Sequence, residues 1–423
     1  MDTEWEAMTE HERRLREHIQ GCHERARRHL GASDADVQRG MELHRELLVC
    51  DSFTLPWTIP SAAGIRRLNA AIEAGWDASQ VHQLRLDINA ADVALDDDCA
   101  RLHEAIFEAS GVNCTVINAG PGPGLNYALR GLARFQQVCD ALPERWTKAV
   151  HASRARQAFA EGRRAMIFSA NNPPADAGFA DGYEQLRWLE WFHRVGFRIM
   201  HLTYNRRNWV GDGCMEEANG GLSAFGHAVV ERMNELGIVI DTPHTGTRTT
   251  LDAAAASSAP IAASHTVCRA VRDHPRGKTD RELRAIAEGG GFVGVTCVSG
   301  FLREGGGTIA DLLNHVEHAV DVAGIDHVGI GTDNGYAVPP PAEPELLPLP
   351  KMRRHWWSFW LPGTLGGGND EGRDGSLSWV CWPYFTVGLL MRAYSEEQVA
   401  KIVSANALRL FEDVEAAASV QVR

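Results

Sequence analysis

Eight short apolar runs, which alternate with helical patterns, constrain the fold of this chain more than any other feature. The runs are rich in small and β-branched residues, which is typical of parallel strands buried on both faces. Strands of this kind that alternate with helices predict an α/β fold, a closed (β/α)8 TIM barrel. The predicted strands cover residues 47–50, 112–118, 164–168, 197–203, 237–241, 260–264, 291–297 and 328–332.

Three polar side chains stand at the ends of these runs. His244 and His265 follow the fifth and sixth runs, and Asp333 follows the eighth. Barrel enzymes collect their catalytic groups at the C-terminal ends of the strands, so we expect the three to converge on one mouth. A single buried histidine is most often a hydrogen-bonded core residue. Two histidines on adjacent strands that face a third polar group favour a functional site.

The sequence divides into an N-terminal helical extension, residues 1–45, and a barrel, residues 46–423. The extension mixes Glu and Arg, as solvated helices do. The barrel includes a proline-rich, aromatic and glycine-rich excursion, 336–380, which predicts a lid. Its Trp356, Trp357 and Trp360 either cover the pocket or form a dimer interface. A C-terminal helix is expected from the cap at Ser395 to about Val414.

The overall composition excludes several classes of protein. A net charge of −13 provides no basic surface for a nucleic-acid partner. No apolar run is long enough to span a bilayer, and the acidic N-terminus does not resemble a signal peptide. Nine cysteines, scattered singly, indicate reduced thiols rather than disulfides. We therefore expect a cytoplasmic protein with no membrane or nucleic-acid partner.

Several motifs together identify a family. They are the stretches 197–203, 221–226 and 233–241, the pairs at 243–244 and 264–265, His274-Pro275-Arg276, Gly329-Ile330-Gly331-Thr332-Asp333 and Asn406-Ala407-Leu408-Arg409-Leu410-Phe411. With them the chain resembles the membrane (renal) dipeptidase family of zinc peptidases, which are amidohydrolase-like barrels. The resemblance implies a homodimer that hydrolyses dipeptides.

The resemblance also assigns roles to individual residues. In the family two zinc ions share a carboxylate, and His244 and His265 match the histidines that hold the second zinc. Asp333 matches the aspartate that handles the proton. Arg276 matches the arginine that grips the C-terminal carboxylate of the substrate, for which a planar guanidinium is suited.

Three positions depart from the family pattern. The stretch Asp51-Ser52-Phe53-Thr54-Leu55 stands where a His-x-Asp pair should hold the first zinc. Asn171 replaces the bridging Glu, and Tyr204 replaces a histidine after the fourth strand. The chain therefore resembles a divergent bacterial branch that lacks the first-zinc ligands. We expect one divalent metal, zinc.

Two roles remain open for Asp333. It is either a third metal ligand, which leaves one position for an activated water, or an unliganded general base. In the first case Tyr204 or water must move the proton. Tyr204 is alternatively an oxyanion donor or only an aromatic lining residue. Asn171 is expected to orient a water or a substrate amide.

Three functions are compatible with these residues. The leading one is a metal-dependent hydrolase that cleaves the amide bond of a dipeptide or a similar small substrate with a carboxylate. The second is a lyase or hydrolase of a non-peptide metabolite. The third is a catalytically silent binding protein on the same barrel.

Overall fold

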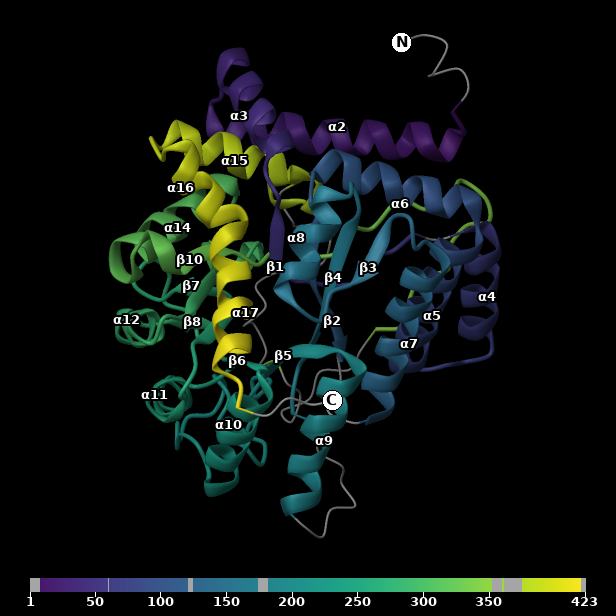
Figure 1. Cartoon of the computed structure of the whole chain (residues 1–423). Coiled ribbons are helices and arrows are strands. Elements are labelled where there is room, and N and C mark those ends of the chain that lie inside the picture. Colours follow the sequence, from purple (N-terminus) through teal and green to yellow (C-terminus); the bar gives the residue numbers. More distant parts are fainter. Residues whose placement is uncertain are drawn as a thin grey trace.

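A computed structural model describes residues 8–59, 61–120, 125–173, 182–351, 360 and 375–419 of the chain. It confirms the predicted barrel: eight parallel strands form its wall and helices surround them (Figure 1). The order of the strands around the wall is β1-β2-β4-β5-β6-β7-β9-β10. Their bounds are β1 (Cys50–Thr54), β2 (Cys114–Gly120), β4 (Arg164–Ala170), β5 (Phe197–His201), β6 (Val239–Asp241), β7 (Ile261–Cys268), β9 (Phe292–Val295) and β10 (Val328–Ile330).

The barrel closes where β1 meets β10. The Asp333 amide donates to the Phe53 carbonyl at 2.9 Å, and Ser52 Oγ reaches the Ile330 carbonyl at 3.0 Å. The same hydroxyl lies 2.9 Å from the Ser264 carbonyl across the barrel interior. A Cβ added at Gly331 would lie 2.0 Å from that carbonyl oxygen. Glycine is therefore required where the closing strand approaches the barrel axis.

Asp51 fixes this closure from the side chain. Its carboxylate accepts from the Thr332 amide at 2.9 Å, the Thr332 hydroxyl at 2.6 Å and the Trp379 indole at 2.8 Å. A further bond comes from the Phe53 amide at 3.2 Å. Burial nevertheless raises the pKa of Asp51 to about 7. The Asp51 carboxylate is fully buried, and its hydrogen bonds stabilise the closure of the barrel.

The helices pack an apolar layer against the outside of the wall, as expected for strands that are buried on both faces. Many begin at a side-chain cap, for example α3 at Ser33 and α12 at Thr279, each with a capping box. Figure 1 shows α10, α11, α12 and α14 on one side and α4 to α7 on the other. The helices are α2 (Glu10–Leu30), α3 (Asp34–Glu46), α4 (Ala62–Glu73), α5 (Ala78–Leu95), α6 (Asp97–Ser110), α7 (Leu125–Ala141), α8 (Ala152–Ala160), α9 (Gly182–Val195), α10 (Ala224–Leu236), α11 (Thr247–Ala256), α12 (Asp280–Glu288), α13 (Ser299–Leu302), α14 (Ile309–Ala323), α15 (Trp382–Met391), α16 (Glu396–Ala400) and α17 (Asn406–Ala417).

Most strand boundaries differ from the prediction by one to three residues, and larger differences concern the first strand, β7 and two additional short strands. The first strand begins at Cys50, because α3 continues to Glu46 and the apolar residues 47–49 connect the two. β7 continues through a register shift to Cys268, so His265 lies within the strand rather than after it. Two short strands were not expected: β3 (Trp146–Lys148), which pairs with β4, and β8 (Gly277–Lys278), which pairs with β7.

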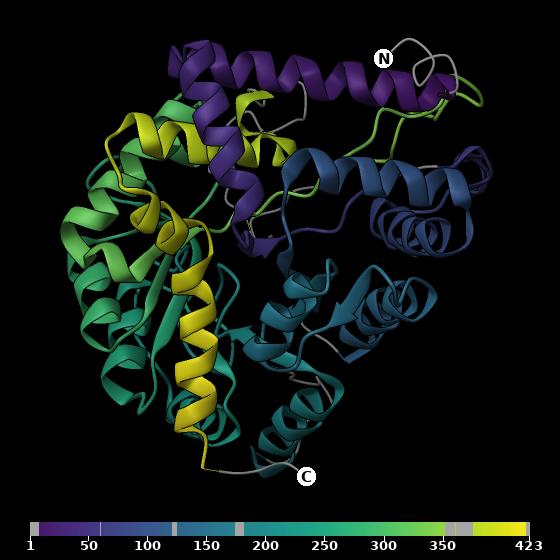
Figure 2. The same cartoon turned by 45° about the horizontal axis from the view of Figure 1, so that its top comes forward.

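The N-terminal helix α2 packs on the outside of the barrel, and the two ends of the chain lie on opposite sides of the molecule (Figures 1 and 2). Helix α2 crosses the top of the molecule in both views and contacts the short helices η3 (Gly375–Leu377) and η4 (Trp379–Cys381) (Figures 1 and 2). The predicted C-terminal helix begins at the expected Ser395 cap, and a π-helical turn, η5 (Lys401–Ala405), divides it. No disulfide links the nine cysteines, all of which lie in the described segments. No described helix is long and apolar enough to cross a membrane.

Candidate metal centre and active site

The two histidines predicted from the strand ends meet in the structure. His244 follows β6 and His265 lies in β7, and their Nε2 atoms are 3.0 Å apart. Both side chains are buried, at 2% and 0% exposure. Burial first, and the nearby Arg276 second, hold the pKa of both rings well below the ordinary value. Both imidazoles are therefore neutral at neutral pH.

The neighbours of the two rings decide where each proton sits. Nδ1 of His244 lies 2.6 Å from Oδ1 of Asn205, which can only accept. Nδ1 of His265 lies 2.8 Å from Oγ of Ser264, whose own proton goes to Asp241 at 2.5 Å. Each Nδ1 is thus a donor, and each neutral ring carries a lone pair on Nε2.

Two lone pairs that face each other at 3.0 Å repel, so the pair is suited to hold a cation. Nitrogen atoms about 2.1 Å from one tetrahedral zinc ion would lie roughly 3.4 Å apart, close to the observed separation. The residues present therefore fit the divalent metal that the sequence predicts.

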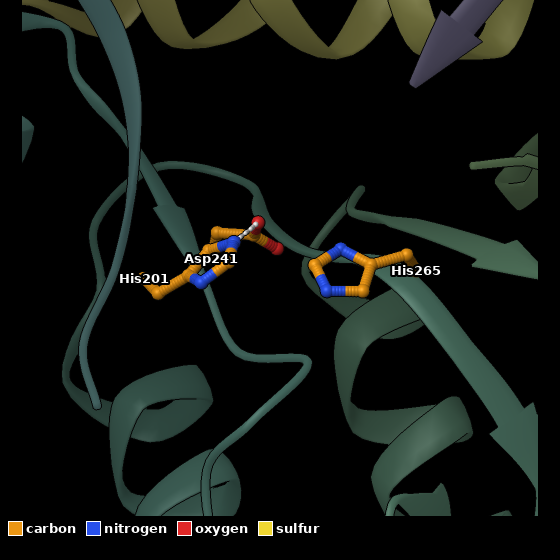
Figure 3. A group of neighbouring side chains, drawn as sticks. All are labelled: His201, Asp241 and His265. Atoms are coloured by element: carbon orange, nitrogen blue, oxygen red, sulfur yellow. Dashed lines mark ion pairs between the residues drawn. The ribbon is translucent and has the colours of Figure 1, made fainter. Parts of the chain in front are cut away.

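A third histidine lies beside this pair. His201, Asp241 and His265 each offer a ligand atom, and these atoms lie within 4.8 Å of one another (Figure 3). All three side chains are buried. Nε2 of His201 is 3.1 Å from Oδ2 of Asp241, but neither ring nitrogen of His201 has a hydrogen-bond partner among the described residues. Such unsatisfied buried nitrogen atoms are costly unless something binds them.

Strand register brings these groups together. His201 ends β5 and Asp241 ends β6, and the two residues are direct partners in the parallel ladder. Partners in register share a face of the sheet. Asp241 also accepts from the Ser264 amide at 2.8 Å, so β5, β6 and β7 are fixed to one another at this level.

Phe53 occupies the side of the site that β1 forms. Its ring stacks on His265, with centroids 3.9 Å apart and planes at 22°, and lies 5.1 Å from the ring of His201. The side chain is 2% exposed. An apolar ring therefore packs directly against the two histidines, from the stretch in which the resemblance had placed a His-x-Asp pair.

Arg276 lies next to the histidine pair, in the turn before β8. Its Nη2 donates to the His265 carbonyl at 3.0 Å and its Nη1 donates to the Pro243 carbonyl, while Nε has no partner among the described residues. The side chain is 1% exposed. The guanidinium thus contacts both segments that carry the histidines, and some of its five N–H groups remain available to a ligand. Its predicted role toward a substrate carboxylate stays a prediction.

Tyr204 covers the histidine pair. Its ring stacks on His244, with centroids 4.1 Å apart and planes at 24°. Burial, and then the charge of Asp333, raise the pKa of Tyr204 to about 12, so its hydroxyl keeps its proton. A protonated phenol is a hydrogen-bond donor, which is what the predicted oxyanion role needs.

Trp360 places part of the predicted lid over the site. Its ring contacts His244 edge-on at 6.0 Å and Tyr204 at 6.2 Å, and it stacks on Phe301 at 5.7 Å. Trp356 and Trp357 lie outside the described residues.

Asp333 and Asn171 lie at the ends of their strands, as predicted. Asp333 follows β10 with φ of 53°, a left-handed conformation that Asp tolerates and that is frequent at functional sites. The group of three metal-binding candidates does not include it among the described residues. Asn171 is 5% exposed directly after β4. Their roles as ligand or base, and as orienting amide, remain predictions.

Sequence reasoning missed His201, Asp241 and Asn205. Asp241 stands at the end of a recognised strand, so its position was a usable signal. His201 lies within an apolar strand, where a histidine resembles an ordinary core residue. Asn205, with φ of 60°, holds His244 through a loop contact that no local pattern indicates.

Comparisons with known proteins match this chain to one family. The family described as membrane dipeptidase (peptidase family M19) matches residues 38–343, well over half of the chain. The dipeptidase verJ of Clonostachys rogersoniana is 27% identical over 226 residues, which are 53% of this chain and 50% of that protein. The chain thus spans about half the length of curated relatives such as this one.

Solved structures share the fold. The probable dipeptidase PvdM of Pseudomonas aeruginosa has a TM-score of 0.66 and 20% identity, over 92% of this chain and 100% of that chain. A metallo peptidase of Rhodobacter sphaeroides, liganded with a phosphinate mimic of the dipeptide L-Ala-D-Ala, has a TM-score of 0.61 and 19% identity. It covers 87% of this chain and 99% of that chain.

Proposed function

The chain belongs to the membrane dipeptidase family, and on that premise we propose that it is a metal-dependent hydrolase of dipeptides or similar small amides that bear a carboxylate. The observation that carries this proposal is the pair of facing Nε2 atoms of His244 and His265 at 3.0 Å. The buried His201 beside them adds to it, because its Nδ1 has no hydrogen-bond partner among the described residues and its Nε2 lies 3.1 Å from Oδ2 of Asp241. These are features of a metal centre rather than of a core.

We propose that one divalent ion, zinc, is held by His244, His265 and His201. Three protein ligands are usual for catalytic zinc. Asp241 supplies the nearby negative charge and orients His265 through Ser264, as carboxylates behind metal-binding histidines do. Phe53 fills the β1 side, which supports one ion rather than two.

When bound, such an ion polarises a carbonyl and lowers the pKa of water. The remaining steps fall to residues of this chain. With three histidines on the ion, Asp333 is not needed as a ligand and acts as the general base. Tyr204 donates its hydroxyl to the oxygen on which negative charge develops. Trp360 limits the access of bulk water above them.

Arg276 defines the substrate class in this proposal. Its spare N–H donors lie beside the histidine pair, where they can take one carboxylate of a small substrate. The Rhodobacter structure, which shares this fold, holds a dipeptide mimic. A dipeptide has a carboxylate about one residue away from the amide that is cleaved.

A substrate panel tests the function. Protein purified without chelator is assayed against dipeptides and non-peptide amides, before and after chelation and after zinc is returned. We expect dipeptide hydrolysis that chelation abolishes and zinc restores. Metal-dependent turnover of non-peptide metabolites alone would assign the barrel to other chemistry. Absence of both metal and turnover would leave a binding protein.

A further inference from the structure

One cavity is lined in part by Asn334, the residue that follows Asp333 in the chain. It has a volume of about 260 Å³ and lies between α2, the segment after β10 and η3. Asn334 contributes to its wall and directly follows Asp333, so the two Cα atoms are about 3.8 Å apart. Its lining residues include His18, Arg25, Asn334, Tyr336 and Gly375.

Tyr336 gives this cavity an unsatisfied donor. The side chain is 3% exposed, and its hydroxyl has no hydrogen-bond partner among the described residues. Its ring packs edge-on against His18, with centroids 6.0 Å apart. A buried hydroxyl without a partner is rare in folded proteins and is explained when a ligand supplies the missing acceptor.

Arg25 gives the cavity a positive charge. No ion pair neutralises this arginine in the described part of the chain, and the lining residues include no carboxylate. Its charge, after burial, lowers the pKa of His18. A Cβ at Gly375 would lie 3.0 Å from Nη1 of Arg25, so the glycine leaves room for the guanidinium. Arg25 is exposed to solvent, and it lines the same cavity as the buried Tyr336 hydroxyl, so the two side chains together offer a charged and a neutral donor to an anion.

We propose that this cavity binds a second carboxylate of the substrate, with Arg25 and the Tyr336 hydroxyl as its donors. The inference rests on the proposed function and makes it more specific: the preferred substrates carry an acidic side chain. Helix α2 lies outside the family match, which begins at residue 38. The preference would therefore belong to this chain's own N-terminal helix rather than to the family barrel.

Equilibrium binding tests this without turnover. N-acetyl-L-glutamate and N-acetyl-L-glutamine share the α-carboxylate and the amide, and they differ only in the side-chain charge. By calorimetry on the full chain, we expect the Kd of N-acetyl-L-glutamate to be at least about tenfold lower than that of N-acetyl-L-glutamine. This is the effect of one hydrogen bond to a charged group. Arg25→Gln should bring the two affinities together. Arg28→Gln, on the exposed face of the same helix, is the matched control and should leave the ratio unchanged.

Tyr336→Phe separates binding from packing. Removing an unpartnered hydroxyl should not lower the melting temperature, yet it should weaken binding of the glutamate compound several-fold. Equal affinities in the wild-type protein, or a ratio that survives Arg25→Gln, would overturn the proposal. Glutarate is also titrated into the free protein and into protein saturated with N-acetyl-L-glutamine. Equal glutarate affinity in both cases would mean that the cavity binds a separate anion, and it would overturn the link to the substrate.

The outcomes also distinguish this inference from the proposed function. A charge-dependent ratio without dipeptide hydrolysis would keep the anion site and reject the hydrolase. Dipeptide hydrolysis with no preference for acidic side chains would keep the hydrolase and reject the site.

Discussion

Two regions at the barrel mouth use polar residues in opposite ways. In the β1–β10 seam, Asp51 accepts two hydrogen bonds from Thr332, and Ser52 donates to the carbonyl of Ile330. In the β5–β7 sector, formed by His201, Asp241, His244 and His265, two lone pairs face each other, and Nδ1 of His201 has no hydrogen-bond partner among the described residues. The buried polar groups of the seam have hydrogen-bond partners, whereas those of the sector are only partly satisfied.

This difference in hydrogen bonding indicates which region carries the proposed reaction. Satisfied buried groups hold strands together, and unsatisfied ones persist only where a ligand or ion completes them. Phe53 marks the boundary between the two, because its ring comes from the seam and packs on His265 of the sector. Changes in the sector should therefore alter metal and activity, and changes in the seam should alter stability.

The largest effect is expected for His265→Ala. This imidazole contacts both His244 and, through Ser264, Asp241. We expect bound metal and turnover to fall to background, with an unchanged circular dichroism spectrum; His244→Ala should behave alike. His151→Ala, at the exposed start of α8, is the control. Retention of metal by either sector variant would mean that the ligands lie elsewhere.

The second-largest effect on activity is expected for Asp333→Asn. Loss of an acid–base group lowers kcat by about a hundred- to ten-thousandfold. If Asp333 is a base, as proposed, the variant keeps its metal and loses the acidic limb of the pH–rate profile. Loss of metal would show instead that it is a ligand. Asp326→Asn, on the exposed turn before β10, should have no effect; normal turnover of Asp333→Asn would reject the proposed mechanism.

A smaller effect is expected for Arg276→Lys. Lysine keeps the charge but loses the planar fork, so KM should rise roughly ten- to a hundredfold with little change in kcat. Arg269→Lys, which alters a partly exposed arginine paired with Asp273, is the matched control. An unchanged KM on every substrate found would dismiss the role of Arg276 in carboxylate binding.

The smallest effect on activity is expected in the seam. Asp51→Asn places an amide against the Thr332 and Trp379 donors, so the free energy of unfolding should fall by about 1–3 kcal/mol. Metal content and kcat should stay unchanged, as measured by elemental analysis and steady-state assay. A loss of metal in this variant would contradict the assignment of stability to the seam and of metal binding to the sector.

The same variant tests the titration of Asp51. Burial raises its folded pKa to about 7 from the ordinary 3.8, so the folded state holds this proton more tightly than the unfolded state. Between about pH 4 and 7 the free energy of unfolding should therefore fall as pH rises. Asp51→Asn should lose that part of the slope, and an identical slope in both proteins would reject the titration.

The fold and half of the sector were predictable from local pattern. Apolar runs and their helical partners predicted all eight wall strands, and strand ends predicted His244 and His265. His201 was not predictable, because a histidine in an apolar strand resembles a core residue until register places it beside Asp241. The stacking of Phe53 on His265 joins residues far apart in sequence, so no local pattern contains it.

Metal content, measured side by side for the wild-type protein and His201→Ala, tests the central claim most directly. The proteins are purified without chelator, dialysed and analysed for divalent ions per chain. The β5–β7 sector as described predicts close to one zinc ion per wild-type chain and a large loss of zinc in His201→Ala. A wild-type chain that retains close to two ions, or a His201→Ala variant with the wild-type amount, would contradict it.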